Sequence, residues 1–290
     1  MRILIFGGDG MLGHQLYMQL RDHHDVRVTL RGDADSYARF NLFTPADCIA
    51  GIDVRDSRRL DEALADAAPE AVINAVGIVK QRSDAAEHIP SLEINALFPH
   101  KLLERCNAGG IRLVHLSTDC VFSGRDGNYT EESPPDATDL YGRTKLLGEV
   151  GEGMGITLRS SIIGLELSRK SGLIEWFLAQ RGRIRGFRKA IYTGLTTMEM
   201  TRVIERLLMD FPGMNGLWHV ASKPIDKYEL LSTLSAKLGR DDIEIDPDDA
   251  FVCDRSLDGS KFAAATGYVA PSWDIMLTEL AGEIRRRGEG

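Results

Sequence analysis

The chain has few cysteines, and no two of them form a Cys-x-x-Cys pair. The four are Cys48, Cys106, Cys120 and Cys253. Zinc sites and redox dithiols are typically built from closely spaced cysteines, so this spacing carries the signature of neither. We expect four free thiols, as in proteins of a reducing compartment. The seven histidines are also scattered, and we therefore expect no metal site.

Long apolar runs and an excess of positive charge are missing as well. No stretch approaches the roughly 18 apolar residues of a membrane-spanning helix. The apolar run Ile3–Phe6 is too short for the core of a signal peptide. The formal net charge is -8, which gives no electrostatic support to nucleic-acid binding. The sequence thus predicts a cytoplasmic protein that binds neither membranes nor nucleic acids.

The first half of the chain alternates between short apolar stretches and amphipathic stretches. This alternation is typical of parallel β-α-β units whose strands are covered on both faces. The expected fold class is therefore α/β, a Rossmann-type doubly wound parallel sheet. The predicted strands are Arg2–Phe6, Val26–Leu30, Ala71–Asn74, Arg112–Ser117 and Ile156–Ser160. The predicted helices are Leu12–Leu20, Leu60–Ala67, Ile94–Cys106 and Tyr141–Gly151.

A glycine-rich loop joins the first predicted strand to the first predicted helix. Its glycines satisfy both G-x-x-G-x-x-G and G-x-G-x-x-G. Glycine permits a tight turn and the close approach of a pyrophosphate, while the helix offers free N–H groups and the positive end of its dipole. The strand before and the helix after are the context that this motif requires. The residues predicted to bind a dinucleotide here are Gly7, Gly10, Met11, Leu12 and Gly13.

Charged residues beyond the second strand bear on which dinucleotide binds. An acidic residue at that position would bind the ribose of NAD, whereas an arginine accommodates the 2′-phosphate of NADP. Arg31 follows the strand, so we expect NADPH, with NADH as the alternative. Arg31 as a solvated loop charge is the structural alternative. Asp53, beside Val54, either accepts a hydrogen bond from the adenine or caps the next helix, since Asp is a good N-cap.

The pattern becomes less regular after Ser161, where polar and turn-rich segments follow. The length of 290 residues is sufficient for a large α/β domain with a smaller one. We assign residues 1–160 to an NAD(P)-binding Rossmann domain, with part of 190–220 interleaved. Residues 161–290 are assigned mostly to a smaller C-terminal substrate domain.

A threonine, a tyrosine and a lysine form the candidate catalytic group. Thr118 follows the strand Arg112–Ser117, and Tyr141 and Lys145 are spaced i, i+4 on one helix face. The unperturbed pKa of a phenol is about 10, and a nearby ammonium is expected to lower it. With Thr118 donating to a substrate oxygen, these groups suit carbonyl reduction, in which a cofactor gives a hydride and Tyr141 gives a proton.

Three segments around this group resemble the dTDP-4-dehydrorhamnose reductase family, within the extended short-chain dehydrogenases. They are Ser117–Gly124, Tyr129–Glu132 and Tyr141–Glu149. The likeness also covers the glycine loop, Asn74 and Asn95. The resemblance implies a Rossmann fold with a small substrate domain and NADPH as the usual hydride donor. It also implies reduction of C4 of a 4-keto-6-deoxy sugar nucleotide to a hydroxyl.

The resemblance assigns roles to individual residues. It gives the catalytic roles to Thr118, Tyr141 and Lys145. Cofactor contacts, besides Tyr141 and Lys145, are expected from Asn74, Ala75, Val76 and Asn95. Substrate contacts are expected from Ser117, Thr118, Cys120 and Val121 and, by family position, from Arg255. Arg185 is added because it belongs to a basic run, and Tyr192 either stacks on a base of the substrate or packs within the fold. The expected partners are a nucleotide sugar and, as one option, a second copy of the chain in a homodimer.

The chain departs from the family on the substrate side. Val76–Gln81 stands where an aromatic-Thr-Val-Asp pattern is usual, and Cys120 stands where a tyrosine is usual. Related dehydratases carry an acidic residue at the position of Cys120, and related epimerases usually hold NAD. A dehydratase or epimerase and a non-catalytic NADP-binding regulatory subunit are therefore the alternatives to a reductase. The basic run 181–189 either binds the substrate diphosphate or forms a solvated face.

Overall fold

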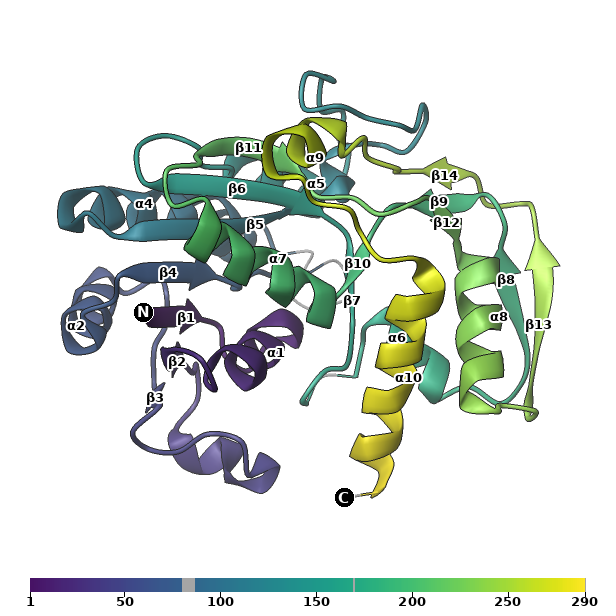
Figure 1. The fold of residues 1–290 in the computed structure, drawn as a ribbon, viewed down its shortest axis with the longest axis horizontal. Coiled ribbons are helices and arrows are strands. Elements are labelled where there is room, and N and C mark those ends of the chain that lie inside the picture. Colours follow the sequence, from purple (N-terminus) through teal and green to yellow (C-terminus); the bar gives the residue numbers. More distant parts are fainter. Residues whose placement is uncertain (80–86, 169, 290) are drawn as a thin grey trace.

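A seven-stranded parallel sheet forms the centre of the molecule. The computed structural model describes residues 1–79, 87–168 and 170–289 (Figure 1). The strand order is β11-β6-β5-β4-β1-β2-β3, and every neighbouring pair is parallel. The strands are β1 Arg2–Phe6, β2 Asp25–Thr29, β3 Cys48–Ile49, β4 Ala71–Asn74, β5 Arg112–Thr118, β6 Gly155–Ser160 and β11 Gly216–His219. The predicted Rossmann-type fold class is confirmed.

Both faces of this sheet are covered, which explains why its strands lack polar alternation. In β1, Ile3 and Ile5 belong to one apolar core, whereas Leu4 and Phe6 belong to another. The first core includes α1 (Met11–Leu20) and α7 (Thr197–Asp210), which pack against each other. The second core includes α2 (Ser57–Ala67) and α4 (Phe98–Gly109).

One helical stretch differs from its prediction at both ends. The sequence predicts a helix over Ile94–Cys106, but helical structure runs from α3 (His88–Ser91) through a π-helical segment, Leu92–Leu97, into α4. The helix that carries the candidate catalytic tyrosine and lysine also differs, because α5 spans Leu140–Leu147 and not the predicted Tyr141–Gly151. It stops at Gly148, where a side chain would lie 1.9 Å from the Asn95 carbonyl oxygen. Close packing of α5 against the π-helical segment that contains Asn95 therefore ends α5 early.

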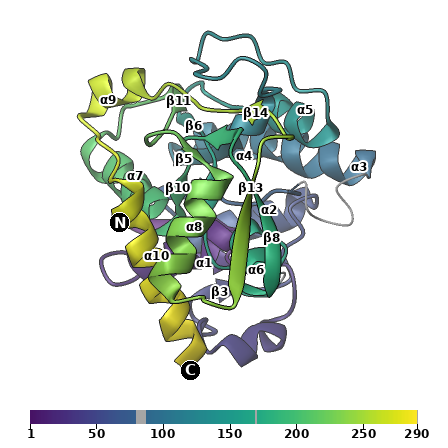
Figure 2. The same ribbon diagram turned by 90° about the vertical axis from the view of Figure 1, so that its right-hand side faces the viewer.

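Three small sheets lie beside the large one, on the side that faces the viewer in Figure 2. The three-stranded sheet has the order β12-β9-β14, and two-stranded sheets join β13 to β8 and β10 to β7. Their strands are β7 Ile162–Ile163, β8 Gly182–Phe187, β9 Ala190–Tyr192, β10 Leu195–Thr196, β12 Ile225–Asp226, β13 Ile243–Asp248 and β14 Cys253–Asp254. The helices of this half are α6 Leu173–Leu178, α8 Lys227–Leu238, α9 Ser260–Thr266 and α10 Trp273–Glu289.

The chain returns to the large sheet after building part of the small ones. Following β8, β9 and β10, it forms α7 against α1 and then adds β11 to β6 in parallel, with Trp218 opposite Leu158. The domain division at residue 160 stays a prediction. In the part of the chain that the structure describes, no helix is long and apolar enough to cross a membrane.

Candidate functional site

A cavity of about 590 Å³ opens at the carboxyl ends of the central strands. Its wall includes residues from just beyond five strands, among them Gly7 after β1, Arg31 after β2, Ala75 after β4, Asp119 after β5 and Ser161 after β6. Open parallel sheets generally bind ligands at this edge. The small sheets close the other side of the cavity through residues of β9 and β14.

The glycine loop forms one end of the cavity and leaves a helix terminus open. Gly7 has φ +88°, in the region that favours glycine, and its carbonyl oxygen accepts a hydrogen bond from Gly10 N at 3.0 Å. A side chain at Gly13 would lie 1.9 Å from that same oxygen, so only glycine lets α1 approach the loop. Gly10 is the N-cap of α1, and no side chain caps the helix. Its first N–H groups are thus available to an anion.

Gly7, Gly10, Met11 and Leu12 line the cavity, whereas Gly13 lies behind the loop and acts through packing. Arg31 also lines the cavity and is exposed, and no hydrogen bond or ion pair engages it among the described residues.

Asp53 and Val54 line the cavity as well, and Asp53 holds a neighbouring arginine. The Asp53 carboxylate accepts hydrogen bonds from Arg55 N at 3.0 Å and from Arg55 Nε at 2.9 Å. This contact keeps the pKa of Asp53 below its usual value. The N-cap of α2 is Asp56, whose carboxylate accepts from Arg58 N and Arg59 N. The alternative in which Asp53 caps the helix is therefore wrong.

Two asparagines shape the loop that follows β4. The Asn74 side chain accepts from Val76 N at 3.0 Å and lies 3.0 Å from Nδ1 of the buried His115. Asn95, in the π-helical segment, accepts from Ile78 N at 2.8 Å and donates to Ile78 O at 3.0 Å. Asn74, Ala75 and Val76 line the cavity, but Asn95 does not. Asn95 acts by holding the loop, whose next residues, Lys80 and Gln81, lie outside the described residues.

Thr118, Tyr141 and Lys145 line the same cavity as the glycine loop. Thr118 ends β5, and Tyr141 and Lys145 lie on α5, whose N-cap Asp139 accepts from Gly142 N at 3.0 Å. A side chain at Gly142 would lie 2.2 Å from the Cys120 carbonyl oxygen, so glycine lets α5 contact the loop after β5. This close approach places the Tyr141 side chain within hydrogen-bonding distance of Thr118.

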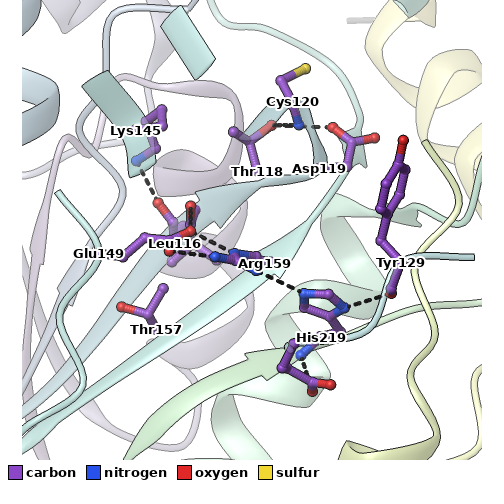
Figure 3. Close-up of polar contacts among 12 residues, drawn as sticks. Leu116, Thr118, Asp119, Cys120, Tyr129, Lys145, Glu149, Thr157, Arg159 and His219 are labelled. Atoms are coloured by element: carbon purple, nitrogen blue, oxygen red, sulfur yellow. Dashed lines mark hydrogen bonds and ion pairs between the residues drawn. The ribbon is translucent and has the colours of Figure 1, made fainter. Parts of the chain in front are cut away.

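Burial dominates the electrostatics of this group. It raises the pKa of Tyr141, although a hydrogen bond with Thr118 acts in the opposite direction. The sequence prediction of a lowered phenol pKa is therefore wrong for this arrangement. Burial also lowers the pKa of Lys145 to about 8. Lys145 is only 5% exposed, and its Nζ donates to Leu116 O at 2.6 Å (Figure 3).

A buried ion-pair network centred on Arg159 and Glu149 lies near Thr118 and Lys145 (Figure 3). Arg159 on β6 donates through Nε and a terminal nitrogen to Glu149, both at 2.7 Å, and Ser117 Oγ donates to the same carboxylate at 2.7 Å. Arg159 also lies 3.2 Å from His219 Nε2, and His219 Nδ1 lies 3.0 Å from Tyr129 O. These contacts fit a neutral histidine that donates from Nδ1, in agreement with a pKa lowered to about 4 by burial and by Arg159.

The expected substrate contacts fall into two groups. Ser117, Thr118, Cys120, Tyr192 and Arg255 line the cavity. Val121 and Arg185 do not. Val121 is fully buried in an apolar cluster with Phe122, because it points away from the cavity into the packing beneath the loop.

Arg185 lies on the exposed face of the small sheet formed by β8 and β13. These strands pair in parallel, and the basic residues of β8 meet acidic residues of β13. Arg185 pairs with Asp248 at 3.2 Å, and Arg183 pairs with Glu244 at 2.8 Å. The basic run thus has the arrangement of the solvated-face alternative.

Several cavity residues are not predicted from the sequence, and Lys227 and Phe251 are two of them. Lys227 begins α8, and Phe251 lies in the turn before β14. No motif marks either one. Only the pairing of distant strands brings them to the site.

A family model described as the RmlD substrate binding domain matches residues 1–151. The chain is 29% identical over 152 residues to methionine adenosyltransferase 2 subunit beta of Mus musculus. It is 30% identical over 149 residues to a dTDP-4-dehydrorhamnose reductase of Streptomyces griseus. Both alignments cover 51% of this chain, but only 41% and 43% of the relatives. The chain thus spans about two fifths of the length of these relatives.

Solved structures match over nearly the whole chain. A hypothetical dTDP-4-dehydrorhamnose reductase from Sulfolobus tokodaii has a TM-score of 0.76 at 25% identity, covering 94% of this chain and 98% of that one. A dTDP-4-dehydrorhamnose reductase from Bacillus anthracis, in complex with NADP, has a TM-score of 0.79 at 18% identity, covering 97% and 99%. A dTDP-glucose 4,6-dehydratase from Streptomyces venezuelae, with NAD bound, has a TM-score of 0.77 at 21% identity, covering 100% and 98%. The last two likenesses show the fold alone.

Proposed function

Because the chain belongs to the family of the RmlD substrate binding domain, we propose that it is an NADPH-dependent reductase. Its substrate is a nucleotide-activated 6-deoxyhexose, and the group reduced is the keto group at C4. The observation that carries this proposal is that Thr118, Tyr141 and Lys145 share one cavity with the glycine loop. A proton donor and a dinucleotide cradle thus face the same space.

The residues at the cofactor end fit NADPH. The uncapped N-terminus of α1 and the Gly7 turn suit the pyrophosphate, and the unpaired Arg31 suits a 2′-phosphate. Asp53 and Val54 lie on the side where the adenine would rest. When bound, the cofactor supplies the hydride, and the protein supplies binding, orientation and the proton.

Tyr141 is the proton donor of the proposed reaction. Its raised pKa keeps the phenol protonated near neutral pH, which is the form that reduction requires. Thr118 Oγ1 donates to Asp119 Oδ1 at 3.2 Å and accepts from Cys120 N at 3.1 Å, so its hydroxyl is held at the mouth of β5. It is positioned to share a substrate oxygen with Tyr141. Lys145, charged below a pH of about 8, stabilises the phenolate that remains after proton transfer.

Absorbance of NADPH tests the proposal directly. Purified protein is offered 4-keto-6-deoxyhexoses linked to dTDP, GDP and UDP, and NADPH oxidation is followed with each. We expect loss of absorbance with one nucleotide, and we expect Tyr141→Phe to slow turnover by about two to four orders of magnitude. NADPH binding by that variant should be unchanged. Full turnover by Tyr141→Phe would rule out the assigned proton donor.

A non-catalytic subunit is the second candidate function. The observation in its favour is the likeness to proteins named as a beta subunit of methionine adenosyltransferase 2. A protein of this kind would bind NADPH and show no turnover with any keto-sugar nucleotide. A dehydratase or epimerase would instead form product with no net NADPH consumption. The same assay separates the three when nucleotide-linked hexoses that keep their 6-hydroxyl are offered as well and the products are analysed.

The other partner predictions remain unchanged. A nucleotide sugar is the proposed partner of the cavity. The homodimer and the cytoplasmic location stay predictions. Gel filtration of the purified chain measures its oligomeric state and so tests the homodimer.

A further inference from the structure

The small sheet β12-β9-β14 brings three distant parts of the chain to one end of the cavity. Ile225 and Asp226 of β12 pair with Tyr192 and Ile191 of β9, so α8 begins beside the cavity with Lys227. On the other edge of β9, Asp254 pairs with Ile191. Arg255 N then donates to Ile191 O at 2.9 Å. Lys227 and Arg255 thus flank β9 from opposite sides.

These two cations have donors that the protein leaves unused. Lys227 is half-buried, and its ammonium makes no hydrogen bond or ion pair with any described residue. Arg255 is also half-buried and donates from Nε to Phe122 O at 2.9 Å. Its two terminal nitrogens have no partner in the described part of the chain. Partly buried cations without partners favour an anionic ligand, because burial is costly for an unpaired charge.

Between the two cations lies a phenol without a partner. Tyr192 is 7% exposed, lines the cavity, and its hydroxyl has no hydrogen-bond partner among the described residues. Buried hydroxyls are normally hydrogen-bonded, so this one is available to a polar ligand. The carboxyl groups near these residues are Asp119 and Asp139, and both act on the charge of Arg255. Burial raises the pKa of Asp119, and the charges of Arg255 and Lys227 act against that rise.

An aromatic ring lies at the mouth of the same end. Phe251 lines the cavity and is 48% exposed, so part of its ring surface is open to a ligand in the cavity. Phe187 supports it from behind, with ring centroids 5.3 Å apart. The backbone is fixed nearby, since Cys253 N donates to Lys189 O at 2.9 Å. A supported, exposed ring is the platform on which a flat base stacks.

We propose that Lys227 and Phe251 form the nucleotide end of the substrate site. Lys227, opposite Arg255, binds the diphosphate, and Phe251 stacks on the base. This inference rests on the proposed function, because it takes a nucleotide-linked sugar as the substrate. It also places the sugar between the two ends of the cavity, next to Thr118.

Binding of nucleoside diphosphates tests this site without turnover. The full chain is first saturated with NADP⁺, so that the cofactor end is filled. UDP, dTDP, GDP and inorganic pyrophosphate are then titrated in by calorimetry. The matched controls are Lys223→Ala for Lys227→Ala and Val252→Ala for Phe251→Ala. Lys223 and Val252 are exposed neighbours that do not line the cavity. Unchanged melting temperature and NADP⁺ affinity show that each variant is folded.

We expect Lys227→Ala to weaken both nucleoside diphosphate and pyrophosphate binding by about tenfold or more, and Lys227→Arg to retain most of it. Phe251→Ala should weaken nucleoside diphosphates by a similar factor and leave pyrophosphate unchanged, whereas Phe251→Trp should retain binding. If the wild type binds a nucleotide and both alanine variants match their controls, this site is wrong and the proposed function stands. If the wild type binds none of the three nucleotides, both proposals fail.

Discussion

At the scale of single residues, burial sets the charge states of the candidate catalytic group. The sequence identifies Tyr141 and Lys145 by spacing, and spacing suggests that the ammonium lowers the phenol pKa. The structure shows instead that Lys145 Nζ donates to Leu116 O and that desolvation raises the pKa of Tyr141. A pattern in sequence reports which groups lie together, but desolvation depends on residues from the whole fold.

The pH dependence of the proposed reduction follows from Lys145. Its pKa falls from 10.5 to about 8, so the ammonium is lost at a pH where free lysine is still charged. We expect turnover at saturating substrate to decline as pH rises through about 8, because the phenolate of Tyr141 then lacks its cation. A pH profile of kcat measures this. Retention of full activity two pH units higher would show that the ammonium is not required.

His219 makes the free energy of unfolding depend on pH in the acidic range. Its pKa is lowered from 6.5 to about 4, so the unfolded chain binds more protons between these values. Stability from this residue is present above a pH of about 6.5 and is lost as pH falls towards 4, by about 3 kcal/mol in total. Denaturant unfolding at several pH values, compared with His219→Gln, isolates the effect. A constant difference between the two proteins across this window would contradict it.

At the scale of elements, strands are predicted well and helix ends poorly. Ala71–Asn74 is predicted at its observed bounds, since a short apolar run bounded by polar residues leaves little freedom. Helix ends depend on neighbours. α5 stops at Gly148 because Asn95 lies against it, and the helix around Asn95 contains a π segment that no periodicity indicates. Asn95 is predicted as a cofactor contact, but its amide is used by Ile78.

The junction of the glycine loop with α1 gives a prediction at this scale. A methyl group at Gly13 would lie 1.9 Å from Gly7 O, so Gly13→Ala must displace the helix or the loop. We expect a loss of about 1–3 kcal/mol in unfolding free energy and a larger loss in NADPH affinity. Gly213→Ala is the control, since nothing lies within 4 Å of that position. Equal NADPH affinity in the two variants would contradict the assigned role of the loop.

At the scale of the whole molecule, the C-terminal helix reaches the wall of the cavity. Arg287 on α10 donates to Glu175, which is almost fully buried on α6. Glu175 also accepts from Glu166 N at 2.9 Å, and the Glu166 carboxylate accepts from Ser171 N at 2.6 Å. Glu166 and Ser171 line the cavity. The position of this wall therefore depends on a residue near the end of the chain.

Removal of this arginine should be costly. Arg287→Ala leaves the buried Glu175 carboxylate without its cation, and because the arginine side chain is itself partly exposed we expect it to lower the unfolding free energy by about 1–2 kcal/mol. The neighbouring Arg286→Ala, which changes an exposed side chain, should have little effect. Thermal unfolding of the two variants measures the difference. Matching stabilities would show that the Arg287–Glu175 ion pair does not stabilise the fold.

The whole-molecule scale also shows where sequence reasoning ends. The glycine loop, the tyrosine and the lysine are all found from local spacing. Lys227 and Phe251 are not, because they reach the cavity only through the pairing of β12 and β14 with β9. Arg185 illustrates the opposite case. Its basic local sequence suggests a contact with the substrate, but β13 supplies a carboxylate that pairs with it.

The late addition of β11 to the central sheet constrains how the protein is made. When residues 1–160 have emerged from the ribosome, six of the seven strands of the large sheet are present, but the outer edge of β6 still lacks its neighbour β11. That edge stays open until Gly216–His219 emerges, while β7 to β10 are being synthesised. Open strand edges pair readily with other chains. A gene fragment cut at residue 160 should therefore yield aggregates, and the nascent protein is most in need of chaperones over this interval.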